Sequence, residues 1–263
     1  MAGSLTGRTA LVTGSTGGLG LAIAGALAEA GCQIMLHGLE AAAAMEERRA
    51  ALQAASGREV AYIEADLAQP AGVQAMVDET SRRFGTLDIL VNNAVVRHFA
   101  PIEAFPTERW DMALAVNISA AFHAVRLALP GMRVRQWGRI VNMASVYGQR
   151  GTAGRVDYVT TKAAIIGLTR AVAVETADQP ITCNAVCPGS VSTPGTEARV
   201  ERLIEEEGLE REEAVRRFLA GKQPSGRFVA AESVAAMVVF LCGPAGQDIT
   251  GAVLPVEGGW LAS

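Results

Sequence analysis

The sequence contains few cysteine and histidine residues, and their spacing does not suit a metal site. The four cysteines are Cys32, Cys183, Cys187 and Cys242, and the three histidines are His37, His98 and His123. No two cysteines form a C-x-x-C pair, and no two histidines form an H-x-x-x-H pair. We therefore expect buried free thiols, and we predict neither disulfides nor a bound metal.

An excess of charge of one sign is also absent. Lysine and arginine number 23 and aspartate and glutamate number 27, which gives a net charge of −4 with both signs interspersed. A continuous basic face is therefore not expected, which argues against nucleic acid and against an anionic membrane surface as partners.

Segments that would direct the chain to a membrane are lacking as well. The first residues, MAGSLTGRTALVTG, do not combine a charged stretch with an apolar one. No apolar run reaches the ~18 residues typical of a membrane span. The expected location is cytoplasmic.

No stretch rich in proline or serine divides the chain. Of its 263 residues, half are apolar, 5% are aromatic and 28 are glycine. This composition suits helices packed closely on a sheet, and the length suits one α/β domain with a large core. We predict a single domain over residues 1–263.

The sequence does contain a regular alternation of short β-branched runs and helical segments. The expected strands are residues 9–12, 33–38, 60–64, 87–91, 139–143, 181–186 and 252–256. The expected helices include residues 41–56, 72–84, 108–133 and 234–241. Such alternation predicts the α/β class with a doubly wound parallel sheet of about seven strands and helices on both faces.

A glycine-rich turn follows the first expected strand. Residues 13–20 read TGSTGGLG, and an alanine-rich helical segment continues to Gly31. A strand, a glycine-rich turn and a helix together bring backbone N–H groups and the positive end of the helix to a pyrophosphate. The turn therefore favours a dinucleotide cofactor over a merely flexible connection.

A tyrosine and a lysine four residues apart supply the candidate chemistry. Tyr158 and Lys162 lead into residues 163–175, which have helical spacing of apolar side chains, so both should project from one helix face. A phenol titrates near pH ~10, and a neighbouring ammonium group would stabilise its phenolate. Ser145 follows the strand at 139–143, and its hydroxyl can hold a substrate oxygen beside the phenol, the general acid and base.

These features resemble the short-chain dehydrogenase/reductase family in their order and spacing. The set comprises Thr13-Gly14-x-x-x-Gly18-x-Gly20, Asn92-Asn93-Ala94, Asn117, Ser145, Tyr158, Lys162 and Pro188-Gly189, and it covers nearly the whole chain. The resemblance implies a Rossmann-type nicotinamide enzyme with Asn117, Ser145, Tyr158 and Lys162 as catalytic residues. In that family the tyrosine exchanges the proton, and the lysine lowers the tyrosine pKa and holds the nicotinamide ribose. The serine orients the substrate oxygen, and the asparagine supports a proton-relay water.

The resemblance also implies a set of cofactor-binding residues. They are Gly14, Thr16, Gly18, Leu19, Gly20, Leu39, Asp66, Leu67, Asn93, Tyr158, Lys162, Pro188, Val191 and Thr193. Residues 15–17 and 37–40 contain no Arg or Lys for a 2′-phosphate, and Glu40 would repel one, so NAD is favoured over NADP. Asp66 can also cap the next helix. Val95 stands where the family usually has glycine, and its effect on cofactor binding stays open.

Residues 190–225 are expected to include a helical lid over the site. Two amphipathic helices are predicted between residues 196 and 222, with apolar side chains at Val200, Leu203, Ile204, Val215, Phe218 and Leu219. A solvated helical excursion without a lid function is the alternative. Family members often form tetramers, so a homotetramer is expected.

Longer stretches narrow the resemblance to one branch of the family. Residues 126–132, 182–189, 222–225 and 258–261 look like those of the bacterial D-3-hydroxybutyrate dehydrogenases. That branch typically holds the substrate carboxylate with Gln, His, Lys and Gln, whereas this chain has Arg97, Tyr147, Arg155 and Arg199 at the matching positions. Guanidinium groups bind carboxylates in a two-point fork. The expected substrate-binding residues are Arg97, Ser145, Tyr147, Arg155, Tyr158 and Arg199, and the expected partner is a small carboxylate.

Three functions remain open at this point. The leading hypothesis is a reversible NAD-dependent dehydrogenase for a 3-hydroxybutyrate-like carboxylate. The second is a reductase of the same family for another hydroxy acid or a sugar-derived or aromatic alcohol, and the third is a nucleotide-binding protein without turnover. The third function is disfavoured, because a protein without turnover has no need of the proton-transfer set Asn117, Ser145, Tyr158 and Lys162. Arginines that point to solvent would weaken the anion pocket. The exact substrate, its stereochemistry and the physiological direction stay open.

Overall fold

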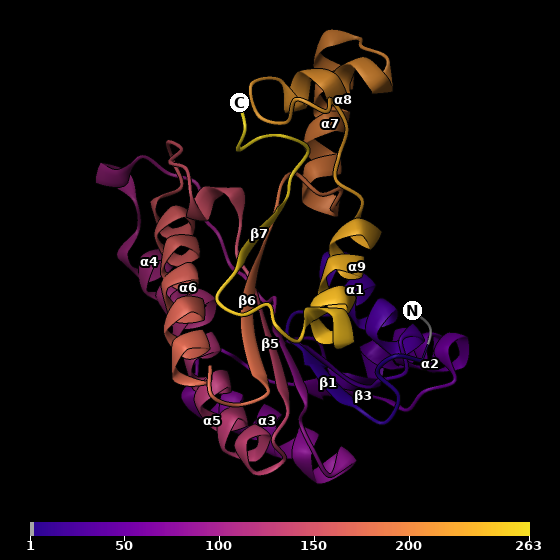
Figure 1. Ribbon diagram of the computed structural model, residues 1–263. Helices are drawn as coiled ribbons and strands as arrows, with labels where there is room; N and C mark the ends of the chain where they lie inside the picture. Colours follow the sequence, from indigo (N-terminus) through magenta and orange to yellow (C-terminus); the bar gives the residue numbers. More distant parts are fainter. Residues whose placement is uncertain (1–2) are drawn as a thin grey trace.

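A seven-stranded parallel sheet forms the centre of the protein (Figure 1). The computed structural model describes residues 3–263 apart from the side chain of Pro194, so residues 1 and 2 of the expected domain lie outside it. The strand order is β3-β2-β1-β4-β5-β6-β7, and each pair of neighbours is parallel. The strands are β1 (Thr9–Val12), β2 (Gln33–Gly38), β3 (Val60–Glu64), β4 (Ile89–Asn92), β5 (Gly138–Met143), β6 (Ile181–Pro188) and β7 (Val253–Val256). The predicted fold class is confirmed.

The direction of strand addition reverses between β1 and β4. In the observed register Val12 of β1 lies beside Leu36 of β2 on one side and Val91 of β4 on the other. Ligands of open α/β sheets bind in the crevice that such a reversal leaves at the carboxyl ends of the strands. The glycine-rich turn after β1 and the Asn93-Ala94 segment after β4 meet at this crevice.

Helices cover both faces of the sheet. On one face α1 (Gly18–Glu29) packs against α9 (Ala231–Cys242), and on the other lie α3 (Pro70–Phe84), α5 (Ala120–Val134) and α6 (Val156–Glu175) (Figure 1). The helix α2 (Ala42–Ser56) contacts α1 and β3. Short turns of 3₁₀-helix occur at η1 (Ile102–Ala104), η3 (Val146–Gly148) and η4 (Pro244–Gly246). Three clusters of buried apolar side chains between the helices and the sheet form the core.

The helix expected at residues 108–133 is not one regular α-helix. The segment α4 (Thr107–Leu114) runs into a π-helical turn, η2 (Ala115–Ser119), which is followed directly by α5. A π turn inserts a residue into the i→i+4 ladder and is frequent at functional sites. The expectation was wrong in this turn because apolar spacing does not distinguish α from π geometry. The turn contains Asn117.

The joined helix Thr107–Val134 is 28 residues long and apolar enough to pass a length and composition test for a membrane span. Its residues Ala120, Ala124 and Met132 are buried in the core cluster that also contains β4 and β5 residues. We therefore assign this helix to the packed interior of the α/β domain.

Smaller differences from expectation concern the ends of elements. The fourth strand begins at Ile89, two residues after its predicted start, and the Asp88 carboxylate just before it accepts a hydrogen bond from the Thr9 backbone at 3.1 Å. The sixth strand extends to Pro188, which pairs with Val256 of β7. The third helix begins at Pro70, a residue that the first helical position tolerates well.

Two helices project beyond the carboxyl ends of β6 and β7, as Figure 1 shows. They are α7 (Pro194–Glu207) and α8 (Arg211–Leu219), and they form the pair expected between residues 196 and 222. The α7 helix is followed directly by Gly208, whose φ of 64° is the left-handed conformation that favours glycine. The pair stands at the same edge of the sheet as the glycine-rich turn.

Candidate active site

The glycine-rich turn leaves no room for side chains at two of its positions. A Cβ atom on Gly14 would lie 2.8 Å from the Ala94 Cα, and one on Gly20 would lie 2.2 Å from the Gly14 oxygen. The Asn93 side chain donates hydrogen bonds of 2.9 Å to the carbonyls of Thr13 and Gly14. The Thr13 hydroxyl accepts from the backbone of Asn93 and Ala94. The turn is thus held against the end of β4, and its backbone geometry fits a pyrophosphate at the start of α1.

A histidine that sequence reasoning left without a role supports this turn. The Nδ1 atom of His37 accepts a hydrogen bond from the Gly14 backbone at 3.1 Å, and Nε2 lies 3.0 Å from the Ala65 carbonyl. An acceptor at Nδ1 and a donor at Nε2 define a neutral ring, and burial lowers the His37 pKa. The only sequence signal was a lone polar residue within an apolar strand.

At the expected adenosine end of the crevice, a carboxylate and a cation lie near each other. The Glu40 carboxylate accepts a hydrogen bond from the Leu39 backbone at 3.1 Å. Its pKa is lowered, first by a hydrogen bond from its own backbone and then by the Thr16 hydroxyl and Leu39 backbone. The Arg48 guanidinium reaches from α2 and donates to the Thr16 carbonyl. Arg48 was missed because it lies outside the residues that follow the strand ends.

Asp66, in the segment after β3, stabilises a local turn through its side chain. The Asp66 carboxylate accepts a hydrogen bond of 2.9 Å from the Ala68 backbone, whereas Gln69 occupies the N-cap position of α3. The expected alternative, in which Asp66 caps that helix, is therefore wrong by three residues. Leu67 is buried, and Leu39 at the end of β2 is 68% exposed.

Tyr158 and Lys162 lie on the first turns of α6, as expected. The Lys162 Nζ atom is 5.6 Å from the centre of the Tyr158 ring and donates to the Met143 carbonyl at 2.5 Å. Burial lowers the pKa of Lys162 from 10.5 to about 8. Ser145 caps η3, where its Oγ accepts from the Tyr147 backbone at 3.2 Å, so its hydroxyl proton can still be donated.

Asn117 connects the π turn to its surroundings through its side chain. Its Oδ1 accepts from the Val96 backbone at 2.8 Å, and its Nδ2 donates to the Val96 carbonyl at 2.9 Å and to the Thr161 hydroxyl at 3.1 Å. A cavity of about 10 Å³ between Asn117 and Lys162 has room for about one water molecule. Both the expected core amide and the expected relay position are compatible with this arrangement.

The end of β6 leads to the expected nicotinamide side of the crevice. Val191 is buried and forms an isolated bridge with Val229. The Thr193 side chain takes part in a capping box with Thr196 at the start of α7. The buried Gln223 accepts from the Ser190 backbone at 2.7 Å. Gln223 therefore fixes the turn after β6, a role that sequence reasoning did not assign.

The substrate side of the crevice joins aromatic and basic groups. The Arg155 guanidinium carbon lies 4.3 Å from the Phe99 ring centre, 5.2 Å from that of Tyr147 and 5.3 Å from that of Tyr158. The Tyr147 ring centre lies 5.3 Å from that of Trp260. Three of these residues were expected here, and Phe99 and Trp260 were not. Phe99 and Trp260 are distant in sequence from Arg155 and Tyr147, so the sequence did not indicate that these side chains lie close together.

Comparison with known proteins identifies the family. The family model described as short chain dehydrogenase matches residues 8–203. The chain belongs to the short-chain dehydrogenase family. It is 45% identical over 258 residues to D-beta-hydroxybutyrate dehydrogenase of Cupriavidus necator, which covers 98% of this chain and 99% of the relative. It is 39% identical to the enzyme of the same name from Rhizobium meliloti, over 97% of this chain and 99% of the relative.

A solved structure has the same fold. L-sorbose reductase from Gluconobacter frateurii, complexed with NADPH and L-sorbose, superimposes with a TM-score of 0.94 at 30% identity and covers 100% of both chains. As a short-chain dehydrogenase, the present chain is an oxidoreductase that acts on CH–OH groups. The resemblance inferred from the motifs is confirmed. The roles of individual site residues stay predictions.

In this short-chain dehydrogenase the crevice fits a nicotinamide dinucleotide. The glycine cradle would hold the pyrophosphate, and the buried Lys162 and the turn at Val191 and Thr193 would hold the nicotinamide half. Val95, the departure from the family pattern, is 39% exposed at the end of β4. The described residues contain no group of three or more His, Cys, Asp or Glu that could hold a metal ion.

Proposed function

We propose that the protein is an NAD-dependent dehydrogenase that interconverts a secondary alcohol and a ketone on a small carboxylate, with 3-hydroxybutyrate and acetoacetate as the candidate pair. The relatives named D-beta-hydroxybutyrate dehydrogenase support this substrate class. The basic groups beside Tyr158 support a carboxylate in particular.

The observation that carries the proposal is the placement of Tyr158 beside the buried ammonium of Lys162. The nicotinamide, when bound, accepts or returns the hydride. Ser145 holds the substrate oxygen, and the Tyr158 hydroxyl exchanges the proton with that oxygen. The Lys162 charge stabilises the phenolate that remains after proton donation. A water between Asn117 and Lys162 would return the proton to solvent.

The preference for NAD is supported by Glu40. Its carboxylate stays ionised near the expected ribose and would repel a 2′-phosphate, while a free ribose hydroxyl could donate to it. Arg48 is the opposing charge, and its guanidinium already donates to the Thr16 carbonyl.

The proposed assembly is a cytoplasmic homotetramer. Exposed apolar side chains on one layer, Met112 of α4, Phe122 of α5 and Val174 of α6, are suited to a contact between subunits. Sedimentation of the purified protein would give the subunit number, and a monomer at micromolar concentration would contradict the tetramer. Fractionation of the source cells, with a membrane-protein marker as control, would test the location.

The decisive experiment follows nicotinamide reduction at 340 nm, roughly the absorbance maximum of the reduced ring, with NAD and a panel of hydroxy acids. Tyr158→Phe should lower kcat for a confirmed substrate by about 10²–10⁴-fold, because the proton donor is lost. NAD binding by the variant serves as the control for folding. Oxidation by Tyr158→Phe at the parent rate would refute the assignment of Tyr158.

A second candidate is a reductase of a sugar-derived or other neutral alcohol. It is favoured by the similarity to L-sorbose reductase and by the four replaced substrate positions. Faster turnover of neutral polyols than of hydroxy acids in the same panel would select this candidate.

A further inference from the structure

Four cationic side chains gather at the mouth of the candidate active site. Arg97 lies in the loop after β4, Arg155 precedes α6, Arg199 lies on α7 and Lys222 follows α8. The guanidinium carbons of Arg155 and Arg199 lie 4.3 and 4.6 Å from the centre of the Phe99 ring, so both cations contact one aromatic side chain. We refer to these four residues as the basic cluster.

Members of the basic cluster repel one another. Burial lowers the pKa of Arg155, and the charges of Arg97 and Arg199 lower it further. Burial also lowers the pKa of Lys222, again with contributions from Arg199 and Arg155. Like charges held together in this way lower the stability of the free protein unless an anion joins them.

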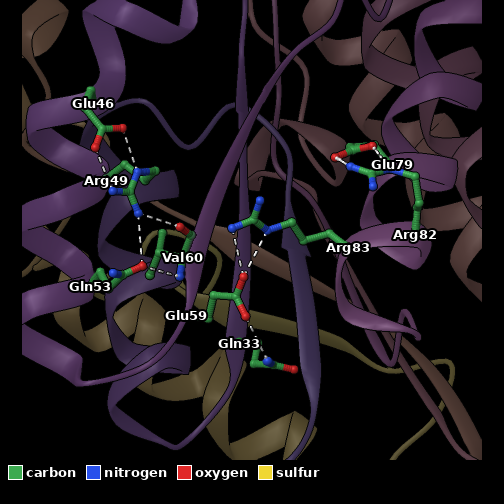
Figure 2. A network of polar contacts seen from close by, with 9 residues as sticks. All are labelled: Gln33, Glu46, Arg49, Gln53, Glu59, Val60, Glu79, Arg82 and Arg83. Carbon is green, nitrogen blue, oxygen red and sulfur yellow. Dashed lines mark hydrogen bonds and ion pairs between the residues drawn. The ribbon is translucent and has the colours of Figure 1, made fainter.

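The described part of the chain supplies no such anion within 4.0 Å. Near the β3 edge of the sheet three arginines each pair with a glutamate (Figure 2), namely Arg49 with Glu46, Arg82 with Glu79 and Arg83 with Glu59. Within residues 3–263, no carboxylate oxygen lies within 4.0 Å of a nitrogen of the basic cluster. The Nε atom of Arg155 is buried and has no hydrogen-bond partner there. A buried donor of this kind can be satisfied by an acceptor from outside the chain, either a water molecule or a ligand.

The backbone that carries Arg97 is fixed on both sides. Val96 exchanges two hydrogen bonds with the Asn117 side chain, and the His98 backbone donates to the buried Asp157 carboxylate at 2.9 Å. The Arg97 side chain is exposed, but its backbone is held in place by these hydrogen bonds. Arg97, from the loop after β4, and Arg199, from α7, thus reach the cluster from different parts of the fold.

We propose that the natural substrate carries two anionic groups, the carboxylate of a 3-hydroxy or 3-oxo acid and a second carboxylate further along its carbon chain. The proposal rests on the proposed function and specifies its substrate class. One carboxylate offers two oxygens with about four acceptor positions, whereas three guanidinium groups alone offer about fifteen N–H donors. A single carboxylate would leave most of the cluster's donors and charge uncompensated.

A hollow lies next to Lys222 of the cluster. Lys222 lines a hollow of about 440 Å³ to which Arg150 and Arg216 also contribute. This volume lies within the range of small-molecule sites. Tyr158 and the three arginines of the cluster are not among its lining residues, so the hollow borders the cluster only at Lys222.

The test compares three substrates with each nicotinamide cofactor in excess. The first is 3-hydroxybutyrate, the second is 3-hydroxypentanedioate, which adds one carboxylate, and the third is the monomethyl ester of the second, which keeps its length but loses that charge. The diacid should have a kcat/KM on the order of tenfold above that of both monoacids. The ester separates the effect of charge from that of size.

Variants then assign the preference to the cluster. Arg97→Gln and Arg199→Gln, both at exposed side chains, should each lower kcat/KM for the diacid about tenfold more than they lower kcat/KM for 3-hydroxybutyrate. The control is Arg170→Gln, which removes the same charge from the exposed side of α6, about 22 Å along the helix from Arg155. This control should leave all three rates unchanged.

The outcomes separate the two proposals. Oxidation of 3-hydroxybutyrate at least as efficient as that of the diacid would overturn the dianion while leaving the proposed function intact. A diacid preference that survives both cluster variants would also overturn it. If none of the three carboxylated alcohols reduces either cofactor, the proposed function fails and the dianion with it.

Discussion

The ammonium group of Lys162 lies 5.6 Å from the centre of the Tyr158 ring and donates its hydrogen bond to the Met143 carbonyl. The lysine is therefore anchored to the end of β5, while the tyrosine stands one helical turn before it on α6. A cation held by the sheet rather than by the phenol keeps its position whether Tyr158 is protonated or ionised. This arrangement provides a preorganised electrostatic partner for proton transfer.

We expect Lys162→Met to lower activity and to raise stability. The folded protein holds a buried charge at pH 7, since the pKa of Lys162 falls from 10.5 to about 8 on burial. Below pH 8 Lys162 is charged in both the folded and the unfolded chain, and the burial of this charge lowers the stability of the folded protein. Between pH 8 and 10.5 the unfolded chain keeps the Lys162 proton while the folded protein loses it, so the free energy of unfolding of the parent rises with pH. The variant should be more stable by about 2 kcal/mol at pH 7, because the pKa shift corresponds to about 3 kcal/mol and the lost hydrogen bond costs about 1 kcal/mol.

Urea unfolding at pH 7 and pH 10 measures this effect. The stability difference between Lys162→Met and the parent should shrink at the higher pH, because the parent lysine is then neutral in the folded state. Turnover should fall by about 10²–10⁴-fold at pH 7. A variant that is less stable than the parent at both pH values would contradict the cost assigned to the buried ammonium.

Much of the fold followed from sequence because its signals are local. The strands at residues 9–12, 33–38 and 60–64 were placed to the residue, since short, mainly apolar runs between turns and helical segments define their own ends. The π turn at Asn117 was not predicted, because one extra residue in the hydrogen-bond ladder of a helix leaves the spacing of apolar residues nearly unchanged. Contacts between distant residues, such as Phe99 with Arg199 and His37 with Gly14, depend on the folded topology.

His37 makes the glycine-rich turn sensitive to acid. Its neutral ring accepts the Gly14 N–H, and a protonated ring has no acceptor to offer. Because burial lowers its pKa, partly offset by the Ala65 carbonyl and the Glu40 charge, the unfolded chain protonates first as pH falls below 6.5. The stability that this group contributes is present above pH 6.5 and is lost as pH falls, by about 1 kcal/mol per pH unit.

His37→Asn keeps a side-chain acceptor but does not titrate. Between pH 7 and pH 5 the parent should lose stability and NAD affinity more steeply than this variant. Unfolding by urea and NAD binding by fluorescence, each at three pH values, would measure the slopes. Equal slopes in the parent and in His37→Asn would exclude His37 as the source of the acid sensitivity.

Asp157 is expected to act on the substrate through the backbone that carries Arg97. Its Oδ2 accepts the His98 N–H at 2.9 Å, and Asp157 is fully buried. Asp157→Ala leaves this N–H without an acceptor and should cost about 1–3 kcal/mol of stability. The loosened segment should raise KM for carboxylates several-fold with a smaller change in kcat.

A neutral alcohol distinguishes this positioning role from general damage. Its KM should be nearly unchanged in Asp157→Ala, since no guanidinium group need contact it. Asp157→Asn retains an acceptor oxygen and should restore most of the carboxylate KM. A parallel rise of KM for charged and neutral alcohols would mean that Asp157 supports the fold alone.

Glu40 and Arg48 oppose each other at the expected adenosine end, and their balance should set the cofactor preference. The Glu40 carboxylate is ionised beside the end of β2, whereas Arg48 donates to the Thr16 carbonyl on the neighbouring turn. Removing the negative charge with Glu40→Gln should raise kcat/KM with NADP relative to NAD by roughly fivefold, as expected for one partly screened charge pair. Arg48→Gln should shift the ratio the other way, because the remaining charge is then repulsive.

Measurements at low and high salt would check the electrostatic origin, since screening should reduce both shifts. If Glu40→Gln left the ratio of NADP to NAD unchanged at low salt, the carboxylate would not face the ribose, and the preference for NAD would lose its support.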